Sequence, residues 1–165
     1  MHRDADPTVV RYQHRQTGWP IVAGALLPFV FAVARLLAPQ PRPPGAPLGP
    51  ALVLVSVVLL VGFSSLSVTV TRDRLVARFG VGLVRRTIAL DDIVDVQLER
   101  TRWVEGWGIH FTRRGMLYNV GGFDVVALRL AGGRRVRIGS DDVERLAAAV
   151  RHAVAERRRT RPSRD

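Results

Sequence analysis

The chain has 165 residues, 47% of which are hydrophobic, and yet it carries a formal net charge of +11. This combination is typical of a protein whose apolar and charged residues occupy separate parts of the chain. The length allows one compact domain beside additional segments. Because there is no cysteine, disulfides, cysteine catalysis and thiolate metal sites are excluded.

Two apolar segments dominate the first third of the chain. Residues 19–37, WPIVAGALLPFVFAVARLL, include one charge, Arg35, and residues 48–66, LGPALVLVSVVLLVGFSSL, include none. A helix of 19 residues spans about 28 Å, which is close to the hydrocarbon thickness of a bilayer. A chain this short cannot bury two such helices in a soluble core. The sequence therefore predicts two transmembrane helices.

The connection between these segments, APQPRPPGAP, is too rich in proline and glycine to continue a helix. We expect transmembrane helices at residues 18–38 and 47–66, joined by a short extracytoplasmic loop at residues 39–46. Together they would form a tight hairpin.

Arginine is unevenly distributed around these segments. The connecting loop contains Arg42 alone, whereas both flanks are richer in arginine: Arg3, Arg11 and Arg15 before the first segment, and Arg72, Arg74, Arg78, Arg85 and Arg86 after the second. The positive-inside rule then places both termini in the cytoplasm of a multi-pass protein of the bacterial inner membrane. A cleaved signal peptide remains an alternative for the first segment. The second segment would then stop transfer and leave the rest of the chain cytoplasmic.

From residue 67 the pattern changes to short alternating runs typical of β-strands. These runs cover residues 67–71, 75–79, 83–90, 93–100, 116–120, 123–130 and 134–138. Gly-Gly pairs at 121–122 and 132–133 indicate hairpins. In the fourth run, Val94, Val96 and Leu98 form the expected core face. Residues 103–115, with two tryptophans, predict an irregular crossing or bulged strands.

The last segment predicts an amphipathic helix. A capping-box pattern begins at Asp141, and apolar residues then recur at helical spacing. The stripe consists of Val143, Leu146, Ala147, Val150 and Val154. About seven short strands followed by one helix fit a bent antiparallel sheet or barrel whose open end the helix covers.

The segment GWGIHFTRRGMLYNVGGFDVVAL, residues 106–128, resembles a recurring segment of bacterial membrane proteins with pleckstrin-homology-like (PH-like) domains. The residues that fill the family's pattern are Gly106, Trp107, Gly108, Ile109, Thr112, Gly115, Leu117, Tyr118, Asn119, Val120, Gly122, Asp124, Val126 and Leu128. Residues 78–93 match the family in style, and a two-helix hairpin upstream is usual for such proteins.

This resemblance to bacterial PH domain proteins implies an α+β membrane protein. A transmembrane hairpin would precede a PH-like seven-stranded antiparallel sandwich or barrel, capped by a C-terminal helix. We expect a cytoplasmic N-terminal tail at residues 1–17, the PH-like domain at residues 67–156 and a basic disordered tail at residues 157–165. Members of this family mostly lack an assigned function, so the resemblance identifies no ligand.

The candidate binding residues are Arg113, Arg114, Trp107 and Tyr118. Paired arginines on a glycine-flanked loop can form forked contacts with phosphate oxygens, although they can also simply solubilise a loop. Trp107 and Tyr118, with Trp103 and Phe111, could form a stacking or lipid-contacting surface, whereas aromatic residues in small β-domains more often close the core.

A second basic group ends the chain. Arg157, Arg158, Arg159 and Arg161 are expected to contact the anionic cytoplasmic leaflet, where each basic residue adds roughly 1 kcal/mol of attraction. Non-specific attraction to nucleic acid is the alternative, which membrane tethering disfavours.

The sequence contains no recognisable catalytic motif, and its four histidines lack metal-ligand spacing. We therefore expect no enzyme, no metal and no cofactor. The leading hypothesis is a membrane-anchored binding or scaffold module, embedded among membrane lipids, with a protein partner or a second copy of the chain as further possible contacts. The alternative is an accessory subunit of a membrane transporter or envelope enzyme complex that acts through its transmembrane helices.

Overall fold

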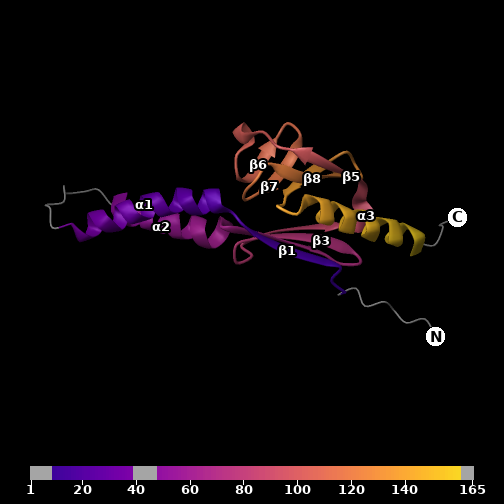
Figure 1. Ribbon diagram of the computed structural model, residues 1–165, viewed down its shortest axis with the longest axis horizontal. Helices are drawn as coiled ribbons and strands as arrows, with labels where there is room; N and C mark the ends of the chain where they lie inside the picture. The colour runs from indigo at the N-terminus through magenta and orange to yellow at the C-terminus, as the bar shows by residue number, and fades with distance from the viewer. Residues whose placement is uncertain (1–8, 39–47, 161–165) are drawn as a thin grey trace.

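The computed structural model describes residues 9–38 and 48–160, so the expected extracytoplasmic loop lies outside the described residues. In this part of the chain the protein is α+β, with three α-helices and two β-sheets of four and five strands (Figure 1). Two helices project side by side from one end of a β-rich domain, and the third lies on the domain itself.

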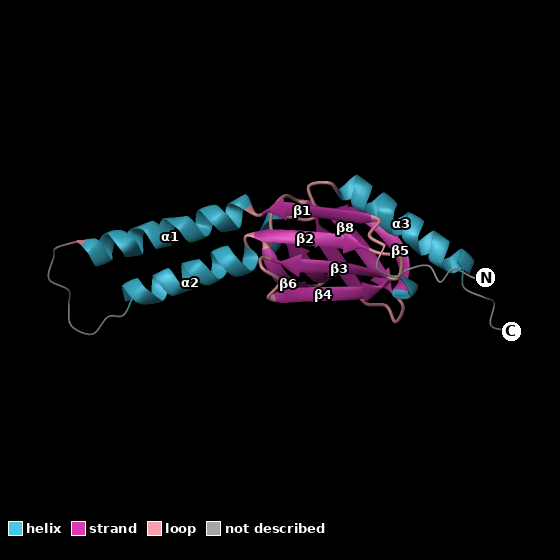
Figure 2. Cartoon of the chain, turned by 90° about the horizontal axis from the view of Figure 1, so that it is seen from below, coloured by secondary structure: helices cyan, strands magenta, loops and turns pink. Residues whose placement is uncertain are grey.

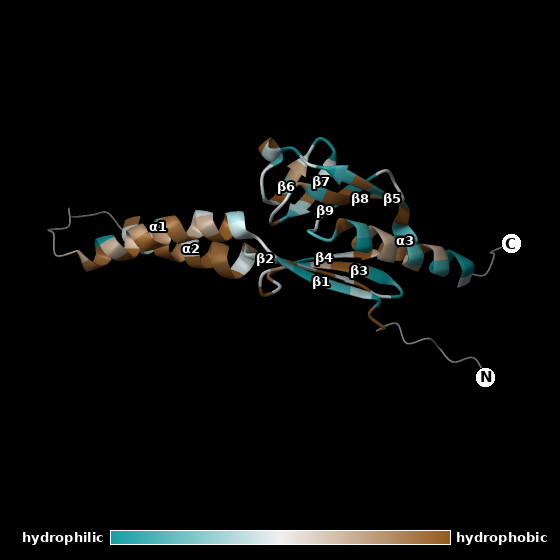
Figure 3. Ribbon diagram, viewed as in Figure 1, coloured by the Kyte–Doolittle hydropathy of each residue, from teal (hydrophilic) through white to brown (hydrophobic). Residues whose placement is uncertain are grey.

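The projecting helices are α1, Trp19–Leu37, and α2, Leu48–Phe63. Their buried residues are Ala25, Ala32, Ser56 and Gly62, and many of their large apolar residues are exposed. Figure 3 shows that both helices consist mostly of hydrophobic residues. Among the described helices, only α1 is long and apolar enough to cross a membrane by length and composition. The prediction that a second helix extends to residue 66 is wrong, because α2 ends at Phe63 and the chain then enters a strand.

The four-stranded sheet consists of β1 (Tyr12–Thr17), β2 (Ser65–Val70), β3 (Arg74–Phe79) and β4 (Val84–Ala89), all antiparallel in that order. The prediction that residues 1–17 form a tail is therefore wrong for β1, which pairs with β2 along its whole length. The two projecting helices are thus inserted between paired neighbouring strands of one sheet (Figure 2).

Both projecting helices are attached directly to the domain core. Ile21 of α1 and Phe63 of α2 pack against it, and the Phe63 ring lies 6.0 Å from that of Phe79. At the base of α1, Gly18 donates its backbone N–H to Ser64 O at 2.7 Å. A Cβ at Gly18 would lie only 2.6 Å from Val120 O. Glycine is therefore required where the loop at residues 120–123 meets α1.

The five-stranded sheet has the order β5-β8-β9-β7-β6. Its strands are β5 (Ile93–Arg100), β6 (Gly108–Thr112), β7 (Gly115–Asn119), β8 (Asp124–Leu130) and β9 (Arg135–Gly139). The expectation of seven antiparallel strands is wrong in two respects. Strands β1 and β6 raise the number to nine within residues 9–38 and 48–160, and β7 pairs with β9 in parallel.

A register shift between Ile93 and Asp95 alters the face assignment of β5. Val96 is buried as predicted, but Val94 and Leu98 are exposed, and Ile93 lies in the core instead. A β-bulge explains Ile93 and Val94, because an extra residue reverses the alternation of side chains on one side of it. Leu98 follows the bulge and has the same parity as Val96, so the bulge does not account for its exposure.

The helix α3, Val143–Thr160, covers the edge of the domain where β1 and β5 lie. Its predicted apolar stripe is confirmed: Leu146, Ala147, Val150 and Val154 are buried and Val143 packs against the core. Because the helix continues to Thr160, the prediction of a disordered tail from residue 157 is wrong for residues 157–160.

Candidate functional site

A basic pocket opens between the two sheets, at the edge opposite α3. It has a volume of about 400 Å³. Three parts of the chain line it: Arg86 of β4, residues 111–116 around the β6–β7 turn, and residues 133–136 around the β8–β9 turn. We call this hollow the basic pocket.

The β6–β7 turn is held by local hydrogen bonds. Thr112 Oγ1 donates to Gly115 O at 2.6 Å and accepts from the Arg114 backbone N–H at 3.2 Å. Gly115 has φ +109°, and a Cβ there would lie 2.3 Å from Arg135 O. Only glycine fits this close approach, which brings the β6–β7 turn against the β8–β9 turn. Arg113 and Arg114 are thereby placed beside Arg134.

The charges of the basic pocket are unbalanced. Arg86, Arg113, Arg114 and Arg134 line it, and none of the four side chains has an ion-pair or hydrogen-bond partner among the described residues. Within the described part of the chain, no carboxylate lines the pocket. Clustered cations without counter-charges create a positive potential that attracts anions.

Arg86 is the deepest of these arginines. The residue is half-buried and points inward between the sheets, and its Nε is buried without a hydrogen-bond partner in the described structure. Leaving a buried polar group unpaired costs free energy, typically about 1–3 kcal/mol. An anion bound in the pocket would supply the missing acceptor.

The pocket also has an apolar wall. Met116 and Val136 face its interior, and Phe111 stands at its mouth with 89% of its surface exposed. A large aromatic ring left in water next to arginines is an unfavourable arrangement that a ligand with both anionic and apolar parts would relieve.

A buried ion pair supports the pocket from behind. Arg137 of β9 is fully buried, and its guanidinium binds both carboxylate oxygens of Glu105 at 3.1 Å and Thr112 Oγ1 at 2.8 Å. The hydrogen bonds from Arg137 lower the pKa of Glu105 below its ordinary value. This pair fastens the short helix at Trp103–Glu105 to the β6–β7 turn and so fixes the turn's position.

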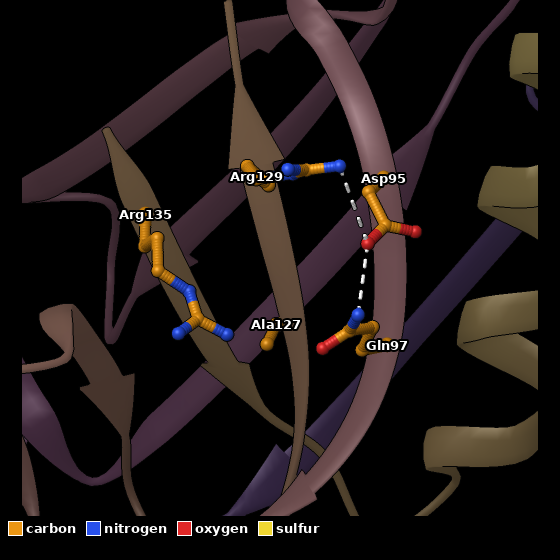
Figure 4. A pocket seen from close by; sticks show the side chains of 5 residues that line it. All are labelled: Asp95, Gln97, Ala127, Arg129 and Arg135. Atoms are coloured by element: carbon orange, nitrogen blue, oxygen red, sulfur yellow. Dashed lines mark hydrogen bonds and ion pairs between the residues drawn. The ribbon is translucent and has the colours of Figure 1, made fainter. Parts of the chain in front are cut away.

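A second hollow, of about 310 Å³, lies on the outer face of the five-stranded sheet (Figure 4). Its charged groups are balanced: Arg129 contacts Asp95 at 3.8 Å, and Gln97 donates to the same carboxylate at 2.9 Å. Arg135, which lines both hollows, pairs with Glu99 at 2.6 Å. We call this the balanced hollow.

The four predicted binding residues lie in different environments in the structure. Arg113 and Arg114 both line the basic pocket. Tyr118 is buried in the core beside Phe79, so the prediction that it contacts a ligand does not fit its position. Trp107 is partly exposed but does not line either hollow. Trp103 and Phe111 are exposed, so the interpretation of these two residues as core aromatics is wrong.

Sequence reasoning did not identify Arg86 and Arg134 as site residues. Both are far from the Arg113-Arg114 pair along the chain, and only the pairing of β7 with β9 and the approach of β4 bring them together. A weak signal existed in the Gly133-Arg134-Arg135 sequence, since it repeats the glycine-flanked arginine pair at the other turn.

The C-terminal arginines predicted to contact the membrane lie on α3. Arg157 binds Asp91 at 3.1 Å, and Arg158 donates to the carbonyls of Ile93 and Val94. The neighbouring Glu156 pairs with Arg11, which is seven residues, or roughly 23 Å of strand, before the base of α1. Arg159 is on the same helical turn, and Arg161 lies outside the described residues.

The described residues contain no group of three or more histidine, aspartate or glutamate side chains arranged to hold a metal ion. The lining of the basic pocket offers guanidinium groups and apolar contacts.

No family model matches the chain, and no curated protein matches it.

Proposed function

We propose that this protein is a non-enzymatic, membrane-anchored binding module whose basic pocket takes up an anionic, phosphate-like group. The observation that carries the proposal is the set of four arginines with no carboxylate partner in the described structure. Guanidinium groups form forked, charge-assisted hydrogen bonds with phosphate oxygens, and several of them together favour a multiply charged ligand.

The membrane anchor in this proposal is the pair α1 and α2, acting as a two-helix hairpin. The 19 residues of α1 span about 28 Å, close to the hydrocarbon thickness, whereas the 16 residues of α2 span about 24 Å, which is shorter than that thickness. Small buried residues between them, such as Ala25 and Ala32, allow close helix packing. The exposed residues of both helices are largely apolar and include Leu27 and Leu54.

The orientation proposed for the hairpin follows the distribution of arginine. The domain end of the helices lies beside Arg15, Arg78 and Arg85, and the exposed Trp19 begins α1 at the same end. Arginine clusters favour the cytoplasmic side, and tryptophan favours the membrane interface. The β-rich domain would then face the cytoplasm of a bacterial cell.

We also propose that the domain is related to bacterial PH-like domains. The support is the motif of residues 106–128 together with a two-sheet core that a C-terminal helix covers. In this proposal β1 belongs to the domain, and the membrane hairpin is an insertion between its first two strands.

The test measures anion binding to the full chain in neutral detergent. Inorganic phosphate is titrated into the wild type and into an Arg113→Gln/Arg114→Gln variant by calorimetry. We expect the variant's affinity to fall by about tenfold or more, since each charge-assisted hydrogen bond contributes about 1.5–3 kcal/mol. Micelles doped with phosphatidylglycerol form a second arm, which shows whether the phosphate of a lipid binds in place of the free ion.

The matched control is Arg100→Gln/Arg145→Gln, which removes the same charge from two exposed side chains that do not line the basic pocket. Equal losses in the pocket variant and the control would contradict the proposal, because they would mean that net charge alone attracts phosphate. The absence of phosphate and lipid binding in the wild type would also contradict it.

A further inference from the structure

The end of the four-stranded sheet nearest the projecting helices carries a row of arginines. The strand register aligns Arg15 of β1 with Ser67 of β2, Ser67 with Arg78 of β3, and Arg78 with Arg85 of β4. Aligned residues of adjacent strands point to the same face of a sheet. This is the outer face, because neighbours in each strand such as Leu66 and Phe79 are in the core.

These arginines have no counter-charge. Arg15 donates to Ser65 Oγ at 3.1 Å, and neither it nor Arg78 nor Arg85 pairs with a carboxylate in the part of the chain that the structure describes. Arg78 and Arg85 are directly opposite each other, and like charges in that position destabilise a sheet. An anion placed beside the pair would attract both guanidinium groups and offset this repulsion.

The turn between β3 and β4 extends beside the end of α2 (Figure 1). Val81 donates its backbone N–H to Val61 O at 3.3 Å, and a Cβ at Gly62 would lie 3.4 Å from Leu83 Cδ1. Val81 and Leu83 are nevertheless 74% and 69% exposed. Their side chains therefore extend the apolar surface of α2 onto the domain.

The row of arginines lies at the depth of lipid headgroups if the helices span the bilayer. Arg78 is two residues before Gly80, Arg85 two after Leu83 and Arg15 three before Gly18, which gives roughly 7–10 Å of strand. The headgroup layer on each side of the hydrocarbon core is about 5–8 Å thick.

We infer that Arg15, Arg78 and Arg85, together with Val81 and Leu83, form an interface anchor that docks on the anionic headgroups of the leaflet from which α1 and α2 emerge. The two apolar side chains enter the acyl boundary, and the arginines bind lipid phosphates. The inference rests on the proposed anchoring of the hairpin in the membrane. It assigns the membrane-contact role to the sheet end in place of the C-terminal arginines.

The chain lacks cysteine, so single-cysteine variants can be labelled at one site. In the Leu83→Cys variant of the full chain, the cysteine carries an environment-sensitive fluorophore. The labelled protein is reconstituted into vesicles with a fixed fraction of spin-labelled lipid. Val94→Cys is the control, since Val94 is also an exposed apolar residue but lies beside Arg158 near the far end of α3. Lipid quenching is expected at position 83 and iodide quenching at position 94.

The arginines are tested by comparing spin-labelled phosphatidylglycerol with spin-labelled phosphatidylcholine. We expect the anionic lipid to quench the label at position 83 more strongly. Arg78→Gln/Arg85→Gln should reduce this preference by about fivefold per arginine. The Arg113→Gln/Arg114→Gln variant should leave the preference unchanged, which separates the interface anchor from the basic pocket.

A label at position 83 that iodide quenches as strongly as the label at position 94 would overturn the inference while leaving the anchored hairpin intact. Quenching that depends on protein concentration instead of lipid would assign the surface to a second copy of the chain and overturn it too. If alkaline washing removes the protein from the vesicles, the proposed anchoring itself fails.

Discussion

The basic pocket and the balanced hollow share one wall, Arg135, and differ in how their arginines are neutralised. In the balanced hollow, Arg129 contacts Asp95 of β5 (Figure 4), and Arg135 pairs with Glu99 of the same strand. In the basic pocket, four arginines have none among the described residues. The number of arginines is therefore a poor guide to an anion site in a chain with 25 basic residues. What distinguishes the site is the absence of paired carboxylates around it.

The largest effect is expected where an arginine loses its carboxylate inside the protein. Glu105→Ala leaves the fully buried Arg137 without its ion-pair partner. Breaking a buried pair in this way costs about 3–5 kcal/mol. Chemical unfolding of the full chain in detergent should show a fall of this size. Glu144→Ala, on the surface of α3, is the control, and an equal fall there would contradict the role given to the pair.

The same pair predicts a pH dependence. Because Arg137 lowers the pKa of Glu105 in the folded protein, the pair contributes its full stability above the unfolded value of 4.5. That contribution is lost as pH falls from 4.5 through the lower folded pKa. The midpoint of unfolding should therefore decline over this range more steeply in the wild type than in Glu105→Gln. Parallel pH profiles would show that the carboxylate is not coupled to folding.

The second-largest effect concerns the basic pocket itself. Arg134→Glu would supply the carboxylate that the pocket lacks and make it resemble the balanced hollow. The new carboxylate would pair with Arg113 or Arg114 and repel the ligand. We expect phosphate affinity to fall by at least about tenfold. Arg129→Glu, which changes the balanced hollow by the same charge, should have a much smaller effect.

The sequence predicted most of the strands because their alternation is strong. It failed at β1, whose sequence, YQHRQT, contains no aliphatic residue. That strand is stabilised by pairing with β2, in which Arg15 lies opposite Ser67 and Thr17 opposite Ser65, and by the buried Gln16. The Gln16 amide donates to Gly139 O at 3.3 Å and accepts from Asp141 N at 2.8 Å. Contacts of this kind leave no periodic signal in a single sequence.

The candidate site was predicted only in part, because long-range contacts bring its other residues together. The pair Arg113-Arg114 is visible because it is local and flanked by glycine. Arg86 looked like any arginine on a strand, and only the structure shows that it points inward. The hairpin was predicted from hydrophobicity alone, whereas its insertion between paired strands depends on long-range register.

A smaller effect is expected at Arg86, where a substitution should change stability and phosphate binding in opposite directions. Arg86→Met retains the aliphatic volume and removes a half-buried charge whose Nε has no partner in the described structure. We expect the free energy of unfolding to rise by about 1 kcal/mol, because the unpaired group no longer costs desolvation. Phosphate binding should weaken at the same time. A variant that is less stable would show that Arg86 has a structural role instead.

The smallest effect is expected from freeing Arg135, which lines both hollows, from its ion pair with Glu99. Glu99→Gln removes the carboxylate that pairs with Arg135 at 2.6 Å and leaves the four unpaired arginines of the basic pocket untouched. Arg135 then becomes available to an anion in the basic pocket. A partly exposed ion pair of this kind is worth about 0.2–1 kcal/mol, so phosphate affinity should rise by a factor of about 1.4 to 5. Calorimetry of the full chain measures this gain, with Asp95→Gln as the control because Asp95 pairs with Arg129, which does not line the basic pocket.

If the two variants bind phosphate equally well, the affinity follows net charge and the pairing of Arg135 has no part in it. If only Glu99→Gln gains affinity, pairing with the Glu99 carboxylate controls whether Arg135 is available to an anion in the basic pocket.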